Sequence, residues 1–175
     1  MSAPAPRVRD VDEQPRSITA PGIVLGIGLG GFVDGILLHQ VLQWHHMLTS
    51  TDTDTIGVPY YPATTVHGLE INTLWDGLFH AFTWLMVLIG MAMLFSRVQH
   101  GRGAAWRHRT LWGWVLVGWG LFNLVEGTVD HHLLGIHHVR SGDHQLAWDL
   151  GFLGLGAMLV LVGWLLARTA PATDT

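Results

Sequence analysis

Ionisable side chains interrupt the long apolar stretches of this sequence at several points. An ionisable group inside a membrane-spanning helix is energetically expensive, so each such residue is a candidate functional residue. Neutral imidazole together with carboxylate suits Zn, Fe, Mn or Cu(II), and helical bundles build metal sites from inward-facing carboxylates and histidines. The residues concerned are Asp34 and His39, Asp76 and His80, Glu126 and Asp130, and Asp149.

We predict that these side chains meet in one transition-metal site, holding Zn, Fe or Cu. Asp76 and His80 are four residues apart and share a helix face, so the carboxylate is placed to support a histidine ligand. Asp34 points away from His39 on an ideal α-helix, which favours a supporting role for Asp34. The predicted ligands are His39, His80, Glu126, Asp130 and His131, and the supporting or alternative ligands are Asp34, Asp76, Asp149, His46 and His132.

The segment "EGTVDHHLLGIHHVRSGDH", residues 126–144, contains five histidines directly after an apolar stretch. Three interpretations stay open for it. It is a lid whose His131 or His132 completes a metal site, a collecting site that passes metal inward, or an interfacial loop whose histidines lie among lipid headgroups. The "WHHMLTSTDTDT" segment is predicted to lie on the same side, so His45 and His46 can join this cluster.

The same polar residues also fit functions without a metal. They can form a proton or ion pathway, or a hydrogen-bonded network that locks the helices together. A haem between His39 and His80 fits less well, because the opposite half of the apolar stretches contains no histidine. The glycine-rich "GIGLGG" lacks the surrounding strand and acidic partner of a dinucleotide loop, so no nucleotide cofactor is expected.

Four apolar stretches must position these residues, and each is long enough for a membrane helix of about 20 residues. The chain is 49% hydrophobic and 13% charged, and it contains no cysteine, which excludes thiolate ligands. We predict an all-α, four-helix transmembrane bundle over residues 21–168, between a disordered cytoplasmic tail (1–20) and a short cytoplasmic tail (169–175). The predicted spans are 21–44, 72–95, 110–130 and 146–167. The glycines of the first span suggest close helix packing, and no internal repeat is expected.

Arginine predicts the orientation of the spans. Of the nine arginines, all but Arg140 fall in the tails or in the loop between the second and third spans. That side is therefore predicted to be cytoplasmic, with both termini inside. Ten of the twelve histidines lie toward the other side, so the metal site is expected to face outward from a bacterial inner membrane. A net charge of −4 gives no indication of nucleic-acid binding.

Several strings together resemble a family of bacterial predicted membrane proteins of unknown function. They are "GFVDGILLHQVLQWHHML", "LWDGLFHAFTWL", "GWGLFNLVEGTVDHHLLGIHHVR" and "WDLGFLGLGA". The resemblance covers residues from about 21 to 168 and implies a four-span inner-membrane protein. It also suggests a link with respiratory oxidase assembly or copper handling.

Two classes of function are consistent with these predictions, and whether the protein is an enzyme stays open. In a metalloenzyme, the metal activates water or oxygen while Glu126 or Asp76 moves protons. In a metal-handling or assembly factor, the loop histidines bind metal reversibly. A structural subunit of a respiratory complex is a third alternative. The expected partners are the lipid bilayer and either a second copy of the chain or a respiratory complex.

Overall fold

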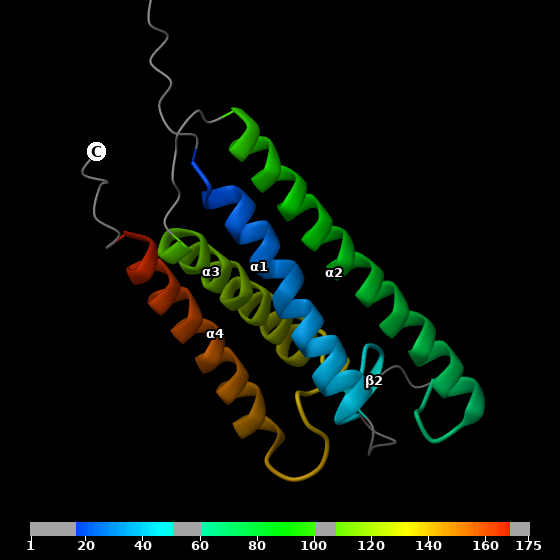
Figure 1. The fold of residues 1–175 in the computed structure, drawn as a ribbon. Coiled ribbons are helices and arrows are strands. Elements are labelled where there is room, and N and C mark those ends of the chain that lie inside the picture. The colour runs from blue at the N-terminus through cyan, green and yellow to red at the C-terminus, as the bar shows by residue number, and fades with distance from the viewer. Residues whose placement is uncertain (1–16, 51–60, 101–107, 169–175) are drawn as a thin grey trace, which may run out of the picture.

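The computed structural model describes residues 17–50, 61–100 and 108–168. Within them the chain is almost entirely helical (Figure 1). The helices are α1 (Thr19–Val33), α2 (Val66–His100), α3 (His108–Glu126) and α4 (Gln145–Arg168). Two π-helices, η1 (Asp34–Val41) and η2 (Gly127–Leu133), continue α1 and α3 without a break. The predicted all-α fold with four helices is confirmed.

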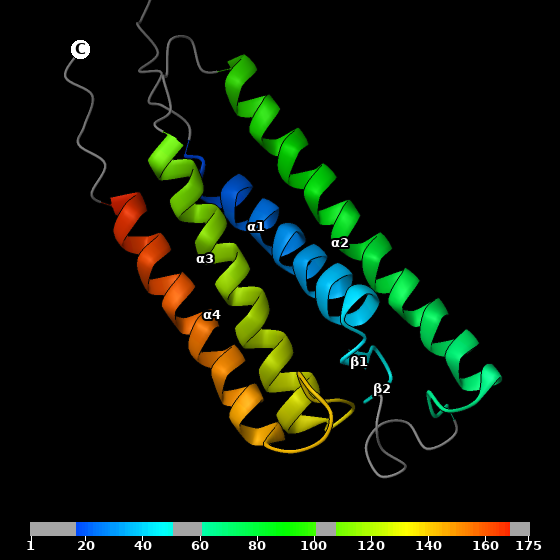
Figure 2. The same ribbon diagram turned by 60° about the horizontal axis from the view of Figure 1, so that its bottom comes forward.

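Two short strands follow the first helix. β1 (His45–His46) pairs antiparallel with β2 (Thr49–Ser50), and His45 lies opposite Ser50 in the register. This tight hairpin turns the chain back at the end of η1 (Figure 2). The pairing was not predicted, because a two-residue strand leaves no periodic pattern in the sequence.

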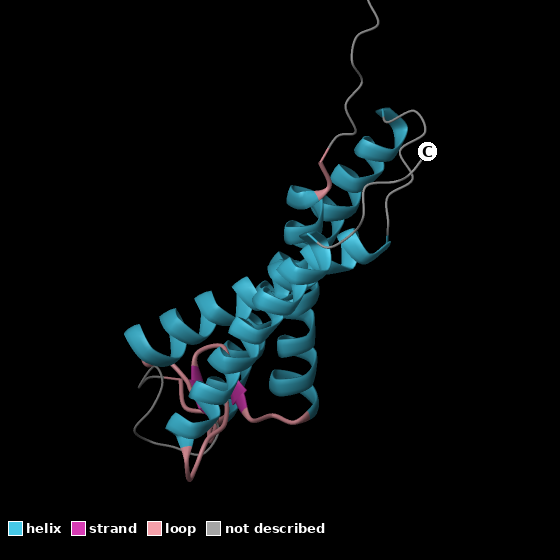
Figure 3. Cartoon of the chain, turned by 90° about the vertical axis from the view of Figure 1, so that its left-hand side faces the viewer, coloured by secondary structure: helices cyan, strands magenta, loops and turns pink. Residues whose placement is uncertain are grey.

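The helices lie side by side in the order α2, α1, α3, α4 (Figures 1 and 2). The extensive contacts join α1 to α2, α1 to α3, and α3 to α4. The protein is therefore two antiparallel helix pairs, α1–α2 and α3–α4, joined through the central helices α1 and α3. Seen edge-on in Figure 3, the helices cross near their middle and diverge toward the end that carries the strands.

Glycine permits the close approach of α1 to α3. A Cβ atom on Gly26 would lie 2.1 Å from the backbone oxygen of Val115, and one on Gly118 would lie 2.1 Å from that of Ile23. No side chain can occupy such a position, because backbone atoms of a packed helix cannot move aside. The glycine pattern therefore marks the seam between the two helix pairs, as small residues do in membrane helices.

The distribution of polar and apolar residues is that of a membrane protein. Among the described residues, buried polar or charged side chains outnumber buried apolar ones, while leucine, phenylalanine and tryptophan side chains cover the outside of α2 and α4. Three helices are long and apolar enough to cross a membrane: Thr19–Val41, Val66–Gln99 and Gln145–Arg168. The remaining helix, α3, is shorter and carries Asn123 and Glu126, which lower its mean hydropathy.

Most helix boundaries lie close to the predicted spans. The first helical segment begins at Thr19, two residues before the predicted start, and α4 extends the predicted fourth span by one residue at each end. The larger difference is α2, which begins at Val66 rather than residue 72. Most of the predicted N-terminal tail, and the whole of the predicted C-terminal tail, lie outside the described residues.

Candidate metal centre

The π-helix η1 brings Asp34 and His39 together at the end of α1. In an α-helix, residues five apart point in directions about 140° apart, which is why Asp34 was expected to point away from His39. A π-helix has i→i+5 hydrogen bonds and a wider turn, and short π segments are frequent at functional sites. Here Asp34 Oδ2 lies 3.2 Å from His39 Nε2, and both side chains are buried.

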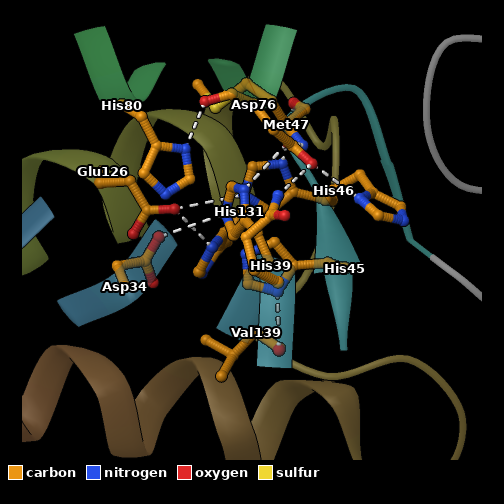
Figure 4. Close-up of polar contacts among 12 residues, drawn as sticks. Asp34, His39, His45, His46, Met47, Asp76, His80, Glu126, His131 and Val139 are labelled. Atoms are coloured by element: carbon orange, nitrogen blue, oxygen red, sulfur yellow. Dashed lines mark hydrogen bonds and ion pairs between the residues drawn. The ribbon is translucent and has the colours of Figure 1, made fainter. Parts of the chain in front are cut away.

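The π-helix η2 likewise brings Glu126 and His131 together at the end of α3. Glu126 and His131 are again five residues apart, and Glu126 Oε1 lies 3.0 Å from His131 Nε2. These contacts join a carboxylate and a histidine within one helical segment, without help from a second helix. Figure 4 shows both pairs pointing into one interior space.

The opposite ring nitrogens of these two histidines face carboxylates on the outer helices. His39 Nδ1 lies 3.0 Å from Asp76 Oδ1 on α2. His131 Nδ1 lies 3.3 Å from Asp149 Oδ1 on α4. Asp76 also accepts hydrogen bonds from His46 Nδ1 at 2.8 Å and from the Met47 backbone N–H at 2.8 Å. A carboxylate behind a histidine fixes the ring orientation and the tautomer, as it does behind metal-binding histidines.

Two more histidines, His45 and His137, complete the interior cluster from the segments after the π-helices. Their rings stack with centroids 4.5 Å apart and an interplanar angle of 7°, and both are fully buried. His45 Nδ1 donates to the Val139 carbonyl at 2.9 Å, and His137 Nδ1 donates to the Met47 carbonyl at 3.2 Å. Since a carbonyl only accepts, Nδ1 carries the proton in both rings and Nε2 presents a lone pair.

Burial keeps both of these rings neutral. It lowers the pKa of His45 well below its usual range and lowers that of His137 to about 3, helped in each case by repulsion from neighbouring histidines. His137 Nε2 nevertheless lies 3.2 Å from Glu126 Oε1. When Nδ1 holds the only ring proton, this contact brings two acceptors together, and a cation or a further proton is needed between them.

Several buried polar atoms around this space have no hydrogen-bond partner among the described residues. A buried polar atom without a partner costs about 1–3 kcal/mol, so native structures contain few of them. Six of the seven belong to this cluster: Asp34 Oδ1 and Oδ2, His39 Nε2, His45 Nε2, Glu126 Oε2 and His131 Nδ1. Three of these six lie at ion-pair distance from a partner without making a hydrogen bond: Asp34 Oδ2 and His39 Nε2 face each other at 3.2 Å, and His131 Nδ1 faces Asp149 at 3.3 Å.

The donor atoms are close enough together to bind a metal ion. One group comprises Asp34, His39 and His45, and an overlapping group comprises His45, Glu126 and His137; within each group the donor atoms lie within 4.8 Å of one another. The chain contains no cysteine, so nitrogen and oxygen are the available donors. Imidazole nitrogen with carboxylate oxygen is a donor set for Zn, Fe, Mn or Cu(II).

The comparison with protein families agrees with this architecture. A family model described as a predicted membrane protein, DUF2243, matches residues 21–170. The chain belongs to the DUF2243 family. The match covers both helix pairs and every residue of the buried cluster, and the family has no assigned function. No curated protein and no solved structure is detectably similar to the chain.

Some of the predicted ligands of this DUF2243 protein lie outside the donor groups. His80 directs Nδ1 to the Asp76 backbone carbonyl at 2.6 Å, and its Nε2 faces Gly35. Asp130 lines an apolar cavity beside Glu126, and His132 is exposed. His39 and Glu126 belong to the donor groups, and so does Asp34, which was expected to support a ligand. His131 contacts Glu126 but belongs to neither group.

Residues 45, 137 and 138 did not appear among the predicted site residues. They follow the helices rather than lying within them, so no helical spacing marked His45 or His137 as inward-facing. His138 supports the centre from outside, through a hydrogen bond from Nδ1 to Asp149 Oδ2.

The contacts also reveal a repeat that was not expected from the sequence. The strings "DGILLHQVLQWHH" (34–46) and "EGTVDHHLLGIHH" (126–138) match at every residue of the buried cluster, with Glu in place of Asp at the first position. "WDGLF" (75–79) and "WDLGF" (148–152) likewise align the two outer carboxylates. The expectation of no internal repeat was wrong, because conserved spacing is confined to the few positions that build the centre.

Equivalent residues of the two halves make equivalent contacts. Asp76 accepts the Met47 N–H, and Asp149 accepts the Val139 N–H at the equivalent position. His46 and His138 donate to the second oxygen of the same carboxylates. The centre therefore has pseudo-two-fold symmetry, with the stacked rings of His45 and His137 meeting across the axis.

The loop that carries His137 is clamped to the first half of the chain. The Arg140 guanidinium lies over the rings of both Trp44 and Trp148, at 5.2 and 5.3 Å from their centroids, and the two rings also contact each other. Ser141 Oγ donates to the Trp44 carbonyl at 3.0 Å. These contacts hold residues 137–141, called the lid below, against the first half of the chain beside the cluster.

Proposed function

We propose that this protein is a multi-pass membrane protein that holds a resident transition metal in the buried His/carboxylate centre. The observation that carries the proposal is the ring arrangement: His45 and His137 direct Nδ1 to a backbone carbonyl and His39 directs it to Asp76, while Nε2 of each ring points into one space. That arrangement is the one that metal-binding histidines adopt. Asp34 and Glu126 would balance the charge of the ion.

Burial favours a resident metal over transient metal handling. His39, His45 and His137 have exposed fractions of 1%, 0% and 0%. Exchange with a partner protein would require opening of the lid that Arg140 holds. The exposed histidines of the 126–144 segment, His132 and His144, contribute to neither donor group, so a collecting role for the loop has no support in these contacts.

An apolar cavity of about 670 Å³ favours chemistry at the centre rather than a purely structural metal. Its walls come from α1, α2 and α3, and its polar lining residues are Glu126 and Asp130. Because Trp75, Leu78 and Phe82 are exposed beside it, the cavity would open toward lipid. We therefore favour a metalloenzyme, hydrolytic or oxidative, acting on a molecule dissolved in the bilayer, with Glu126 as the group that moves protons.

The proposed topology has four spans with the metal centre facing outward. Although α3 is the least hydropathic helix, it lies between α1 and α4 and runs parallel to α1, so it would cross the membrane with them (Figure 1). Arg97, Arg109 and Arg168 lie at the opposite end of the helices from the cluster, which favours that end as cytoplasmic. The proposal includes a bacterial plasma membrane with both termini on the cytoplasmic side.

The test is the metal content of the protein purified in mild detergent without a histidine tag. Elemental mass spectrometry would compare the wild type with the double variant His45→Ala/His137→Ala and with a control that removes two exposed histidines, His67→Ala/His132→Ala. We expect near-stoichiometric metal in the wild type and the control, and at least a tenfold loss in the first variant. Absence of metal from the wild type after reloading with Zn, Fe and Cu would overturn the proposal and leave a proton path or a structural network.

A further inference from the structure

We infer that the centre binds two metal ions, one in each half of the repeat. This inference rests on the proposed function and adds the number of ions and their assignment to residues. The first half supplies Asp34, His39 and His45, and the second supplies Glu126, His131 and His137. Each ion would then have two imidazole nitrogens and one carboxylate from the protein.

The first argument is that each half brings its own donors into contact. The first half forms a donor group by itself, because the ligand atoms of Asp34, His39 and His45 lie within 4.8 Å of one another. In the second half, Glu126 Oε1 lies 3.0 Å from His131 Nε2 and 3.2 Å from His137 Nε2. His45 adjoins the second half as well, because its ligand atom lies within 4.8 Å of those of Glu126 and His137.

The second argument is that the supporting contacts are also duplicated. Asp76 stands behind His39, and Asp149 stands behind His131. His45 and His137 each donate to a carbonyl of the opposite half, at Val139 and at Met47. Each half therefore carries its own supporting groups as well as its own histidines and carboxylate.

The third argument concerns the number of donor side chains. The two halves together offer four imidazoles and two carboxylates, and the two groups of three donors that lie within 4.8 Å of one another share His45. Six donors exceed the four ligands that a tetrahedral Zn²⁺ ion takes. Two ions about 3.5–4 Å apart form a common arrangement in metalloenzymes.

Two histidines with one carboxylate leave coordination positions free for a substrate, oxygen or water. This donor set is the one found in non-haem Fe(II) oxygenases, and His₂Glu sets also hold catalytic Zn²⁺. The free positions of the second ion would adjoin Glu126, which lines the apolar cavity. The chemistry suits a substrate with an apolar body and one polar group that reaches the ions.

The test counts ions per chain in half-specific variants. The protein is stripped with a chelator and reloaded with Zn(II), and bound Zn per chain is measured for the wild type, His39→Ala, His131→Ala and the double variant. The matched control is His132→Ala, which removes the neighbouring exposed histidine of the same π-helix. We expect two ions in the wild type and the control, one in each single variant, and none in the double variant.

A single ion per wild-type chain, lost completely in either single variant, would overturn the two-ion inference and leave the proposed metal function intact. No Zn in any form of the protein would overturn both. Two ions that are both lost in either single variant would overturn the assignment of one ion to each half. If circular dichroism shows that an alanine variant does not fold, electron paramagnetic resonance of the Cu(II)-loaded wild type tests the number of ions instead. Spin-coupled Cu(II) pairs would support two ions per chain, and an isolated Cu(II) signal would refute the two-ion inference.

Discussion

Substitution of Asp76 by asparagine tests whether the outer carboxylates orient the histidine ligands. Asp76 makes no proposed bond to a metal, but it accepts from His39 Nδ1 at 3.0 Å, His46 Nδ1 at 2.8 Å and the Met47 N–H at 2.8 Å. Asparagine keeps the size of the side chain but offers one oxygen instead of two. Its NH₂ group would then face one of these three donors.

The expected loss follows from the role of such a carboxylate. Removing the hydrogen-bonded partner of a metal-binding histidine costs about 10–100-fold in metal affinity, which is about 1.4–2.7 kcal/mol. We expect Asp76→Asn to fall in this range for the ion held by His39. The assay is a competition titration of the detergent-solubilised protein with a chromophoric Zn(II) chelator, and circular dichroism checks that the helices remain.

Two further variants make the result specific. Asp143→Asn is the same chemical change at an exposed position outside the cluster and should leave the affinity unchanged. His46→Ala removes one donor to Asp76 while leaving the contact to His39, so its loss should be smaller than that of Asp76→Asn. An Asp76→Asn variant that folds and binds Zn(II) within twofold of the wild type would refute the reasoning.

Three other predictions concern the framework. Gly26→Ala places a methyl group 2.1 Å from a backbone oxygen of α3 and should lower the free energy of unfolding by about 1–3 kcal/mol or more, measured by thermal unfolding in detergent. Arg140→Ala removes two cation–π contacts, each of about 0.5–1 kcal/mol, and should speed hydrogen exchange in residues 137–141. The metal-free protein should lose stability as pH falls below about 6.5, because burial lowers the pKa of His137 to about 3. In this pH range the unfolded chain binds a proton at His137 and the folded chain does not. Above about pH 6.5 the ring is neutral in both states, so the full stability is present.

For each of these three predictions, a specific result would contradict the reasoning. Gly154→Ala, where an added Cβ meets nothing within 4 Å, is the control for the helix seam, and equal unfolding temperatures for the two glycine variants would contradict the packing argument. Unchanged exchange in the lid of Arg140→Ala would show that the tryptophans do not hold it. A melting temperature that stays flat between pH 7.5 and 5 would contradict the buried, neutral state of His137.

Three of the predicted spans and the polar layer could be predicted because length and composition determine them. A run of about 20 apolar residues indicates a membrane helix, and an ionisable residue within it is expected to face the interior. The third predicted span carries Asn123 and Glu126, so composition marks it less clearly. The rule says only that a side chain avoids lipid and does not select ligands: His39 and Glu126 lie in the donor groups, whereas the Asp76 carbonyl satisfies His80 Nδ1 within one turn.

The π-helices could not be predicted from helical periodicity. The expectation that Asp34 points away from His39 assumed an α-helix. In the π-helix η1, whose turn is wider, the two side chains instead lie together. Spacing alone could have revealed the repeat, because five positions of the first half recur in the second half with the same spacing. The first set is Asp34, Gly35, His39, His45 and His46, and the second set, in the same order, is Glu126, Gly127, His131, His137 and His138. Comparing the two histidine-rich segments with each other, rather than with helix patterns, would have found His45 and His137.

The parallel course of α1 and α3 has a consequence for how such a protein arises. With the four spans proposed above, both helix pairs would enter the membrane in the same direction, and the pseudo-two-fold axis would run along the bilayer normal. A single ancestral hairpin, inserted as a homodimer, would then supply both halves of the centre, and joining two copies of its gene would require no reversal of topology. After such a fusion the copies would be free to diverge, as the different residues at the equivalent positions Asp34 and Glu126, and Met47 and Val139, illustrate.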